Sequence, residues 1–260
     1  MPPTSRTAFN RSPLIRTLAR LDASLDGRPA IAPEPALAEQ TLAETLGQWL
    51  HWTDAISLHG VLNGDPAKDP QLGAPARAPA TASVLAAELR HLRQQLTLSI
   101  TDDDALATEL AELAERAAAA APSEQAWAPC RRRHQALQQA MAARTAPLRA
   151  RLRASLQARS PVLARLAAID AVLASALAER EHHLLAKVPR LLEQHFGRLD
   201  HAQAQARTQA PQPAGHAAPA AAAAALRQTL QQLLLDELAL RLQPLEGLLL
   251  ALQQPPASAT

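Results

Sequence analysis

The chain has 260 residues and a formal net charge of +2, and so small a charge argues against bulk electrostatic binding to nucleic acid or to a membrane surface. Hydrophobic residues make up 48% of the chain but aromatic residues only 2%, and most of the apolar residues are Ala and Leu, which favour helices. The residues that strands prefer are scarce, which excludes a substantial sheet. We therefore predict an all-α fold, an elongated multi-helix bundle with a long central spine helix and Pro/Ala-rich linkers.

The chain is expected to begin with an N-terminal helical region over 1–64. Ser12-Pro13 predicts a helix start, because Ser is a common N-cap and Pro is favoured at the first helical position. A second helix is predicted after Pro35, and Asn63-Gly64 is typical of a helix end. Its apolar face is formed by residues three and four positions apart, which are Leu42, Leu46, Trp49, Thr53 and Ile56.

A Pro/Ala linker over 65–80 and a central helical bundle over 81–203 are expected next. Asp102, Asp103 and Asp104 suit the positive end of a helix dipole and predict the start of a helix within this bundle. Ser160-Pro161 is a second start signal of the Ser-Pro kind and opens the helix that we expect to be the spine of the fold. Its apolar positions are Val162, Leu166, Ile169, Leu173, Leu177, Leu184 and Val188.

A Gln/Ala/Pro linker over 204–219 and a C-terminal Leu-rich helical region over 220–260 complete the chain. Pro244 predicts a break or kink at Gln243-Pro244. Six leucines alternate at spacings of three and four, as in the seam of a coiled coil: Leu235, Leu238, Leu242, Leu245, Leu249 and Leu252. This terminal Leu seam either docks on the spine helix as core, or pairs with a copy of itself or with another protein's helix.

Arginine dominates one part of the chain. Nine Arg and no acid lie between Arg131 and Ile169, whereas residues 102–124 hold seven acids and one Arg. In one interpretation these charges pair across neighbouring helices. In the other, the Arg-rich segment 131–165 binds a polyanion, either nucleic acid or an acidic partner helix, through Arg149, Arg153 and Arg159, which lie close to one helix face. Nucleic acid is the less favoured partner, because the segment has no aromatic stacking platform.

Catalytic motifs are missing. The chain has no Gly-rich phosphate loop and no Cys pair for zinc. The densest group of metal-ligand types is Glu179, Glu181, His182 and His183, which we interpret as a solvated helix flank. Cys130 lies beside Arg131, Arg132 and Arg133 and near His134, features that lower the pKa of a thiol, but nothing indicates the oriented base that a catalytic thiol needs. We expect neither an enzyme nor a bound cofactor or metal.

The same features suggest a location. One cysteine cannot form an internal disulfide, which fits a reducing cytosol. The first 16 residues lack the apolar core of a signal peptide. We find no stretch that approaches the ~20 apolar residues of a membrane span. The expectation is a soluble cytoplasmic protein with no membrane span.

Three stretches, 46–64, 159–196 and 233–253, resemble an uncharacterised proteobacterial family (of Burkholderia and Xanthomonas type) of helical proteins of unknown function. The most specific piece is WTDAIS, from Trp52 to Ser57. The resemblance implies no catalytic residues, and the family's gene neighbourhood implies an accessory to a cell-envelope complex. We expect a non-enzymatic helical interaction or scaffold protein, and the alternative is a nucleic-acid-associated protein that uses 131–165.

Overall fold

The computed structural model describes residues 13–14, 16–18, 21, 52–64, 80–119, 124–186, 188–209 and 217–254. Within these ranges the chain is helical and has no strand, which confirms the all-α prediction. The helices are α4 (Trp52–Asn63), α5 (Ala82–Thr101), α6 (Asp104–Ala119), α7 (Glu124–Arg159), α8 (Pro161–Leu185), α9 (Val188–Gln209) and α10 (Ala217–Gln253). Predictions for Leu42, Leu46 and Trp49, and for most of the 65–80 linker, fall outside these ranges.

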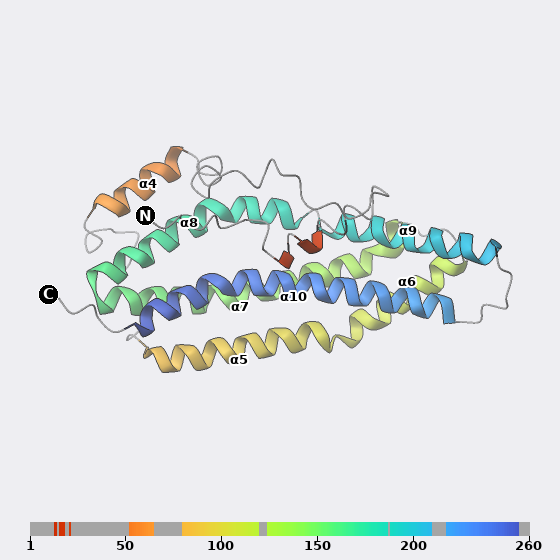
Figure 1. The fold of residues 1–260 in the computed structure, drawn as a ribbon, viewed down its shortest axis with the longest axis horizontal. Helices are drawn as coiled ribbons and strands as arrows, with labels where there is room; N and C mark the ends of the chain where they lie inside the picture. The colour runs from red at the N-terminus through yellow and green to blue at the C-terminus, as the bar shows by residue number, and fades with distance from the viewer. Residues whose placement is uncertain are drawn as a thin grey trace, which may run out of the picture.

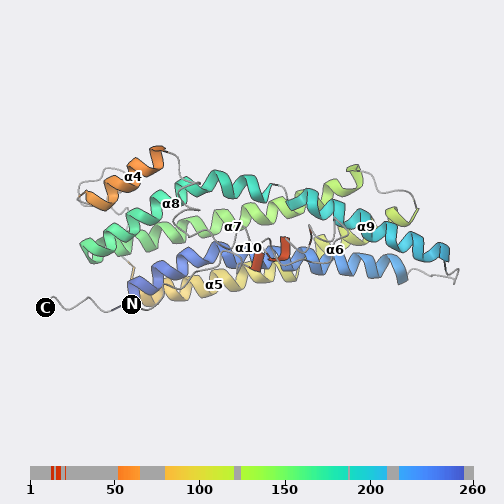
Figure 2. The ribbon, with the colours of Figure 1, turned by 45° about the horizontal axis from the view of Figure 1, so that its top comes forward.

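Four long rods run along an elongated bundle (Figures 1 and 2). The first rod is α5 followed by α6, the second is α7, the third is α8 followed by α9, and the fourth is α10. Successive rods run in opposite directions, as in an up-and-down bundle. The fourth rod packs against α5, α6 and α7, and α4 packs on α8. The central place expected for the helix after Pro161 is therefore taken by α7 and α10, and α8 lies to the side.

One hydrophobic core joins the rods. Residues of α5 at spacings of three and four are buried as their periodicity predicts, from Leu85 to Ile100. The terminal Leu seam lies in the same core, with Leu238, Leu242, Leu245 and Leu252 buried and the other two leucines partly buried. The seam thus serves as core, but it packs mainly against α5, α6 and α7 rather than against α8.

The chain is helical at two places where the sequence predicts an interruption. The expected break at Gln243-Pro244 is absent, because α10 continues through Pro244 to Gln253. Buried leucines on both sides, Leu242 and Leu245, hold this helix in the core and outweigh the lost backbone hydrogen bond. The predicted 204–219 linker is also helical at both ends, since α9 reaches Gln209 and α10 begins at Ala217. Ala and Gln favour helices, and Pro is tolerated in a first turn.

Candidate functional site

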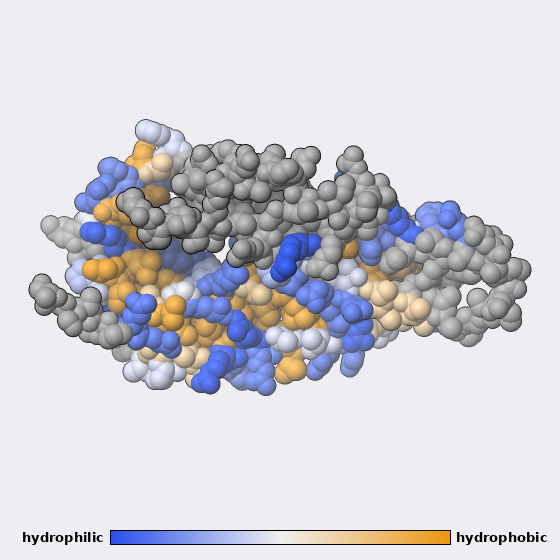
Figure 3. Space-filling model, viewed as in Figure 1, coloured by the Kyte–Doolittle hydropathy of each residue, from blue (hydrophilic) through white to orange (hydrophobic). Residues whose placement is uncertain are grey.

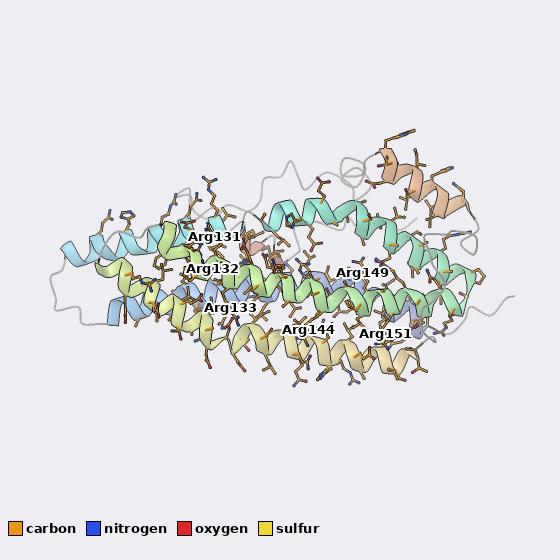
Figure 4. The ribbon with its side chains drawn as sticks, turned by 180° about the vertical axis from the view of Figure 1, so that it is seen from behind. Arg131, Arg132, Arg133, Arg144, Arg149 and Arg151 are labelled. Atoms are coloured by element: carbon orange, nitrogen blue, oxygen red, sulfur yellow. The ribbon has the colours of Figure 1, made fainter. Side chains whose placement is uncertain are left out.

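Several side chains of the Arg-rich segment, six of which are labelled along α7 in Figure 4, form ion pairs inside the protein. Arg133 holds buried Asp103 with two hydrogen bonds, Nε to Oδ2 at 2.7 Å and a terminal nitrogen to Oδ1 at 3.0 Å. Asp103 also accepts the backbone N–H of Leu106 at 3.1 Å, so it caps α6 as the acidic run predicts. Arg151 pairs with Glu88, and a terminal nitrogen of Arg144 donates to the side-chain oxygen of Gln95.

Asp170 of α8 gathers two of the three predicted contact residues. Arg149 and Arg153 donate from Nε to Asp170 Oδ2 at 2.9 Å and 2.6 Å. Burial raises the pKa of this carboxyl, but hydrogen bonds from Arg149 and then Arg153 outweigh it, and the net pKa lies below its ordinary value. The third residue, Arg159, instead donates to the carbonyl of Gln254 at 2.7 Å. These contacts are internal pairs, as in the first interpretation of the Arg-rich segment. Most of the partner acids, however, lie outside 102–124.

Asp170→Asn is expected to lower the free energy of unfolding by about 2 kcal/mol at pH 7, because two half-buried guanidinium groups lose their shared carboxylate. Urea unfolding followed by circular dichroism measures the change. Glu115→Gln, an exposed change on α6, is the control and should stay within about 0.5 kcal/mol of the parent. A loss for Asp170→Asn no larger than that of the control contradicts the expectation.

Polar groups without partners gather at one stretch of α7. Trp127, Cys130 and His134 share a face of this helix and are all buried. Among the residues that the structure describes, four buried polar side-chain atoms have no hydrogen-bond partner: Nε1 of Trp127, both ring nitrogens of His134, and Oε2 of Glu109 in α6. The Trp127 ring stacks on Phe196 of α9, with ring centroids 6.2 Å apart. Unsatisfied buried polar atoms are rare in folded proteins, so this buried polar cluster is the main departure from an ordinary leucine core.

Burial controls the titration of this cluster. It lowers the pKa of His134 to about 4, so the imidazole is neutral at physiological pH. It also raises the pKa of the Cys130 thiol to about 12, with a further rise from the charge of Glu109. The thiol is therefore the opposite of an activated nucleophile. Its Arg neighbours in sequence do not lower this pKa, and one of them, Arg133, binds Asp103 instead.

Cys130 is expected to resist thiol reagents in the native protein. At pH 8 a thiol with a pKa near 12 is almost entirely protonated, and the buried sulfur is inaccessible. Reaction with a disulfide reagent should be at least about 100-fold slower than in denaturant, where the thiol is exposed with an ordinary pKa. Absorbance of the released thiolate measures both rates. Equal native and denatured rates contradict the buried position.

The side chains of the candidate metal-ligand group at 179–183 lie in different surroundings. Glu181 pairs with Arg241 at 2.9 Å, and Glu179 and His182 are exposed. The side chain of His183 falls outside the part of the chain that the structure describes. In that part, no three His, Cys, Asp or Glu side chains come close enough together to hold a metal ion.

Apolar side chains are exposed on α4 and α8, two helices that pack on each other. The most exposed are Trp52, at 80%, and Val162, at 78%, and Ile56 and Leu62 of α4 are about half exposed. Figure 3 shows hydrophobic atoms over α4 and the adjoining end of the bundle. In α8, Pro161–Glu179 has a mean hydropathy of 1.7 over 19 residues, and only 17% of it is buried. By length and composition this is the one described stretch that meets the criterion for a membrane span, which corrects the expectation that none approaches it.

Comparison with known proteins gives a family and no activity. The family described as "Protein of unknown function (DUF3348)" matches residues 2–254. No curated protein and no solved structure matches the chain. The expected resemblance to an uncharacterised family is thereby confirmed for nearly the whole chain.

Proposed function

Because the chain belongs to this family of unknown function, we propose its role from its own surfaces: it is a non-enzymatic helical interaction or scaffold protein. The observation that carries the proposal is the exposed apolar side chains of α4 and α8, two helices that pack on each other, with Trp52 80% and Val162 78% exposed. Large exposed apolar areas on folded proteins often mark the place where a partner binds. The resemblance adds the expectation that the partner belongs to a cell-envelope assembly.

The interaction surface differs from the one that the sequence favours. The terminal Leu seam is occupied within the core, so it offers little apolar area to a partner. In α8, by contrast, only 17% of the apolar stretch is buried, and most of its side chains are partly or fully exposed. A helix docked along α8 would bury the apolar side chains that α4 and α7 leave open.

The alternative of nucleic-acid binding is less well supported by the same contacts. Arg149 and Arg153 hold Asp170, and Arg151 pairs with Glu88, so reaching a phosphate would mean breaking an internal pair. Four Arg of the segment are exposed: Arg144 donates to Gln95 and Arg159 to the carbonyl of Gln254, whereas Arg132 and Arg165 lie far apart in sequence. A mobility shift at low salt that weakens as salt rises would favour this alternative.

Affinity capture with two matched variants tests the proposal. Val162→Asp places a charge on the α8 surface at the second residue of the helix, where an acid also suits the helix dipole. Val84→Asp makes the same change at the third residue of α5 and is the control. The parent and Val84→Asp should capture the same partner, identified by mass spectrometry, and Val162→Asp should lose it. Identical capture by all three chains counts against the proposal.

A further inference from the structure

One line of α8 residues along the apolar stretch is exposed at both ends and partly buried at its centre. It comprises side chains that are exposed or only partly buried, at alternating spacings of three and four: Val162, Arg165, Ile169, Val172, Ala176 and Glu179. We refer to these six residues as the α8 stripe. Their spacing is that of a coiled-coil seam, which keeps one face of a helix against another helix. The stripe is distinct from the part of α8 that faces α7, where Asp170 meets Arg149 and Arg153.

The charges of the α8 stripe lie at its two ends with opposite signs. Arg165 is near the start and Glu179 is at the end, both are exposed, and no ion pair to either occurs among the described residues. The centre, Ile169 to Ala176, carries no charge on this line. A surface with this layout is complementary to itself when a second copy runs in the opposite direction.

We infer that the α8 stripe binds the α8 stripe of a second copy of this chain, antiparallel and about a two-fold axis, an inference that rests on the interaction role proposed above. With the axis between Ile169 and Val172, each of these residues faces the other in the second copy. Val162 faces Glu179 of the second copy, and Arg165 faces Ala176, one helical turn from that same Glu179. Two opposite-charge pairs form, one at each end of the contact.

Other occupants fit the same line less well. A parallel second copy would set Arg165 against Arg165 and Glu179 against Glu179, and like charges repel. A lipid environment would have to accommodate Asp170 and its two guanidinium partners in the middle of the apolar stretch, and polar groups are expensive in a bilayer. The antiparallel pair leaves these groups at the α7 contact and covers about 27 Å of helix at 1.5 Å per residue.

Sedimentation velocity over a concentration series tests the pairing. The parent chain should reach the mass of two copies. Arg165→Glu or Glu179→Arg alone should each raise the dissociation constant about tenfold, because each reverses both charge pairs. An equimolar mixture of the two variants should restore dimers, because each end of the mixed dimer again holds opposite charges. Val162→Asp should also weaken the dimer, whereas Val84→Asp should leave it unchanged.

Circular dichroism confirms that each variant folds. A parent chain that stays monomeric across the series overturns the inference, as does a mixture that associates no better than its two components. Flotation of the monomeric parent with neutral phospholipid vesicles would assign the α8 stripe to a lipid surface instead, and that too overturns it. A monomeric parent that still captures a different protein, lost on Val162→Asp, overturns the second copy as occupant but leaves the proposed function standing.

Discussion

Arg241→Met is expected to lower the free energy of unfolding by about 3 kcal/mol, because it leaves a fully buried carboxylate without its cation. The carboxylate is that of Glu237, whose side chain is 0% exposed. Arg241 donates to Glu237 Oε1 from Nε at 2.9 Å and also pairs with Glu181 on α8. After the substitution the side-chain amide of Gln138, 2.8 Å from Oε2, is the one donor to this carboxylate that remains in the described part of the chain.

A second variant separates the cost of the unpaired charge from the value of the pair. Replacing both partners, as Glu237→Leu with Arg241→Met, removes the buried charge together with its cation. Well-packed apolar replacements of buried pairs are often neutral, so the double variant should be within about 1 kcal/mol of the parent. Guanidinium unfolding measures the parent, both single variants and the double variant. An Arg241→Met loss below about 1 kcal/mol would refute this explanation of the pair.

As the pH falls, protonation of His134 should lower the free energy of unfolding before the carboxylates of the protein are protonated. The folded pKa is about 4 and the ordinary value is 6.5, so below pH 6.5 the unfolded chain binds a proton that the folded chain refuses. Stability is therefore lost as the pH falls from about 6.5 to about 4 and is unaffected by this group above that range. The total loss is about 3 kcal/mol for a shift of this size.

His134→Leu should remove this part of the pH dependence and also relieve two unpartnered nitrogens. Thermal unfolding between pH 7 and pH 4 compares the variant with the parent. The exposed His182→Gln chain is the matched control for the loss of a histidine side chain. His195, whose pKa is also lowered by burial and then by Arg198, adds to the loss with the same sign, so the difference between parent and variant isolates His134. Parallel curves for His134→Leu and the parent would contradict the argument.

The sequence predicts where the helices form better than it predicts which helices pack against each other. Leucine periodicity identifies the buried face of α5 and the seam of α10, and Ser160 does cap α8, with its Oγ accepting the Leu163 N–H at 3.3 Å. Periodicity along one helix does not say which helix lies opposite, so the sequence predicts a central place for the helix after Pro161, which α7 and α10 take in the structure. Proline rules also fail where burial is strong, as at Pro244.

The candidate sites were harder to predict because they depend on contacts between distant segments. Asp170 is a single acid in an apolar helix, and nothing in the sequence shows that Arg149 and Arg153 converge on it. The spacing of Cys130 and His134 places them on one face, but their lack of hydrogen-bond partners depends on what α6 and α9 place around them. The open line on α8 likewise becomes visible only once α4 and α7 are in position.

The last rod of the bundle has a consequence for how the chain is made. The rod α10 contacts α5, α6 and α7, and near the start of the chain Thr17 donates to Asp236 of α10 at 2.6 Å. During synthesis the earlier helices must therefore keep their leucine faces exposed until the C-terminal segment leaves the ribosome. Such incomplete chains are prone to aggregate, so nascent chains should depend on chaperones late in translation, and early termination near residue 217 should yield insoluble product.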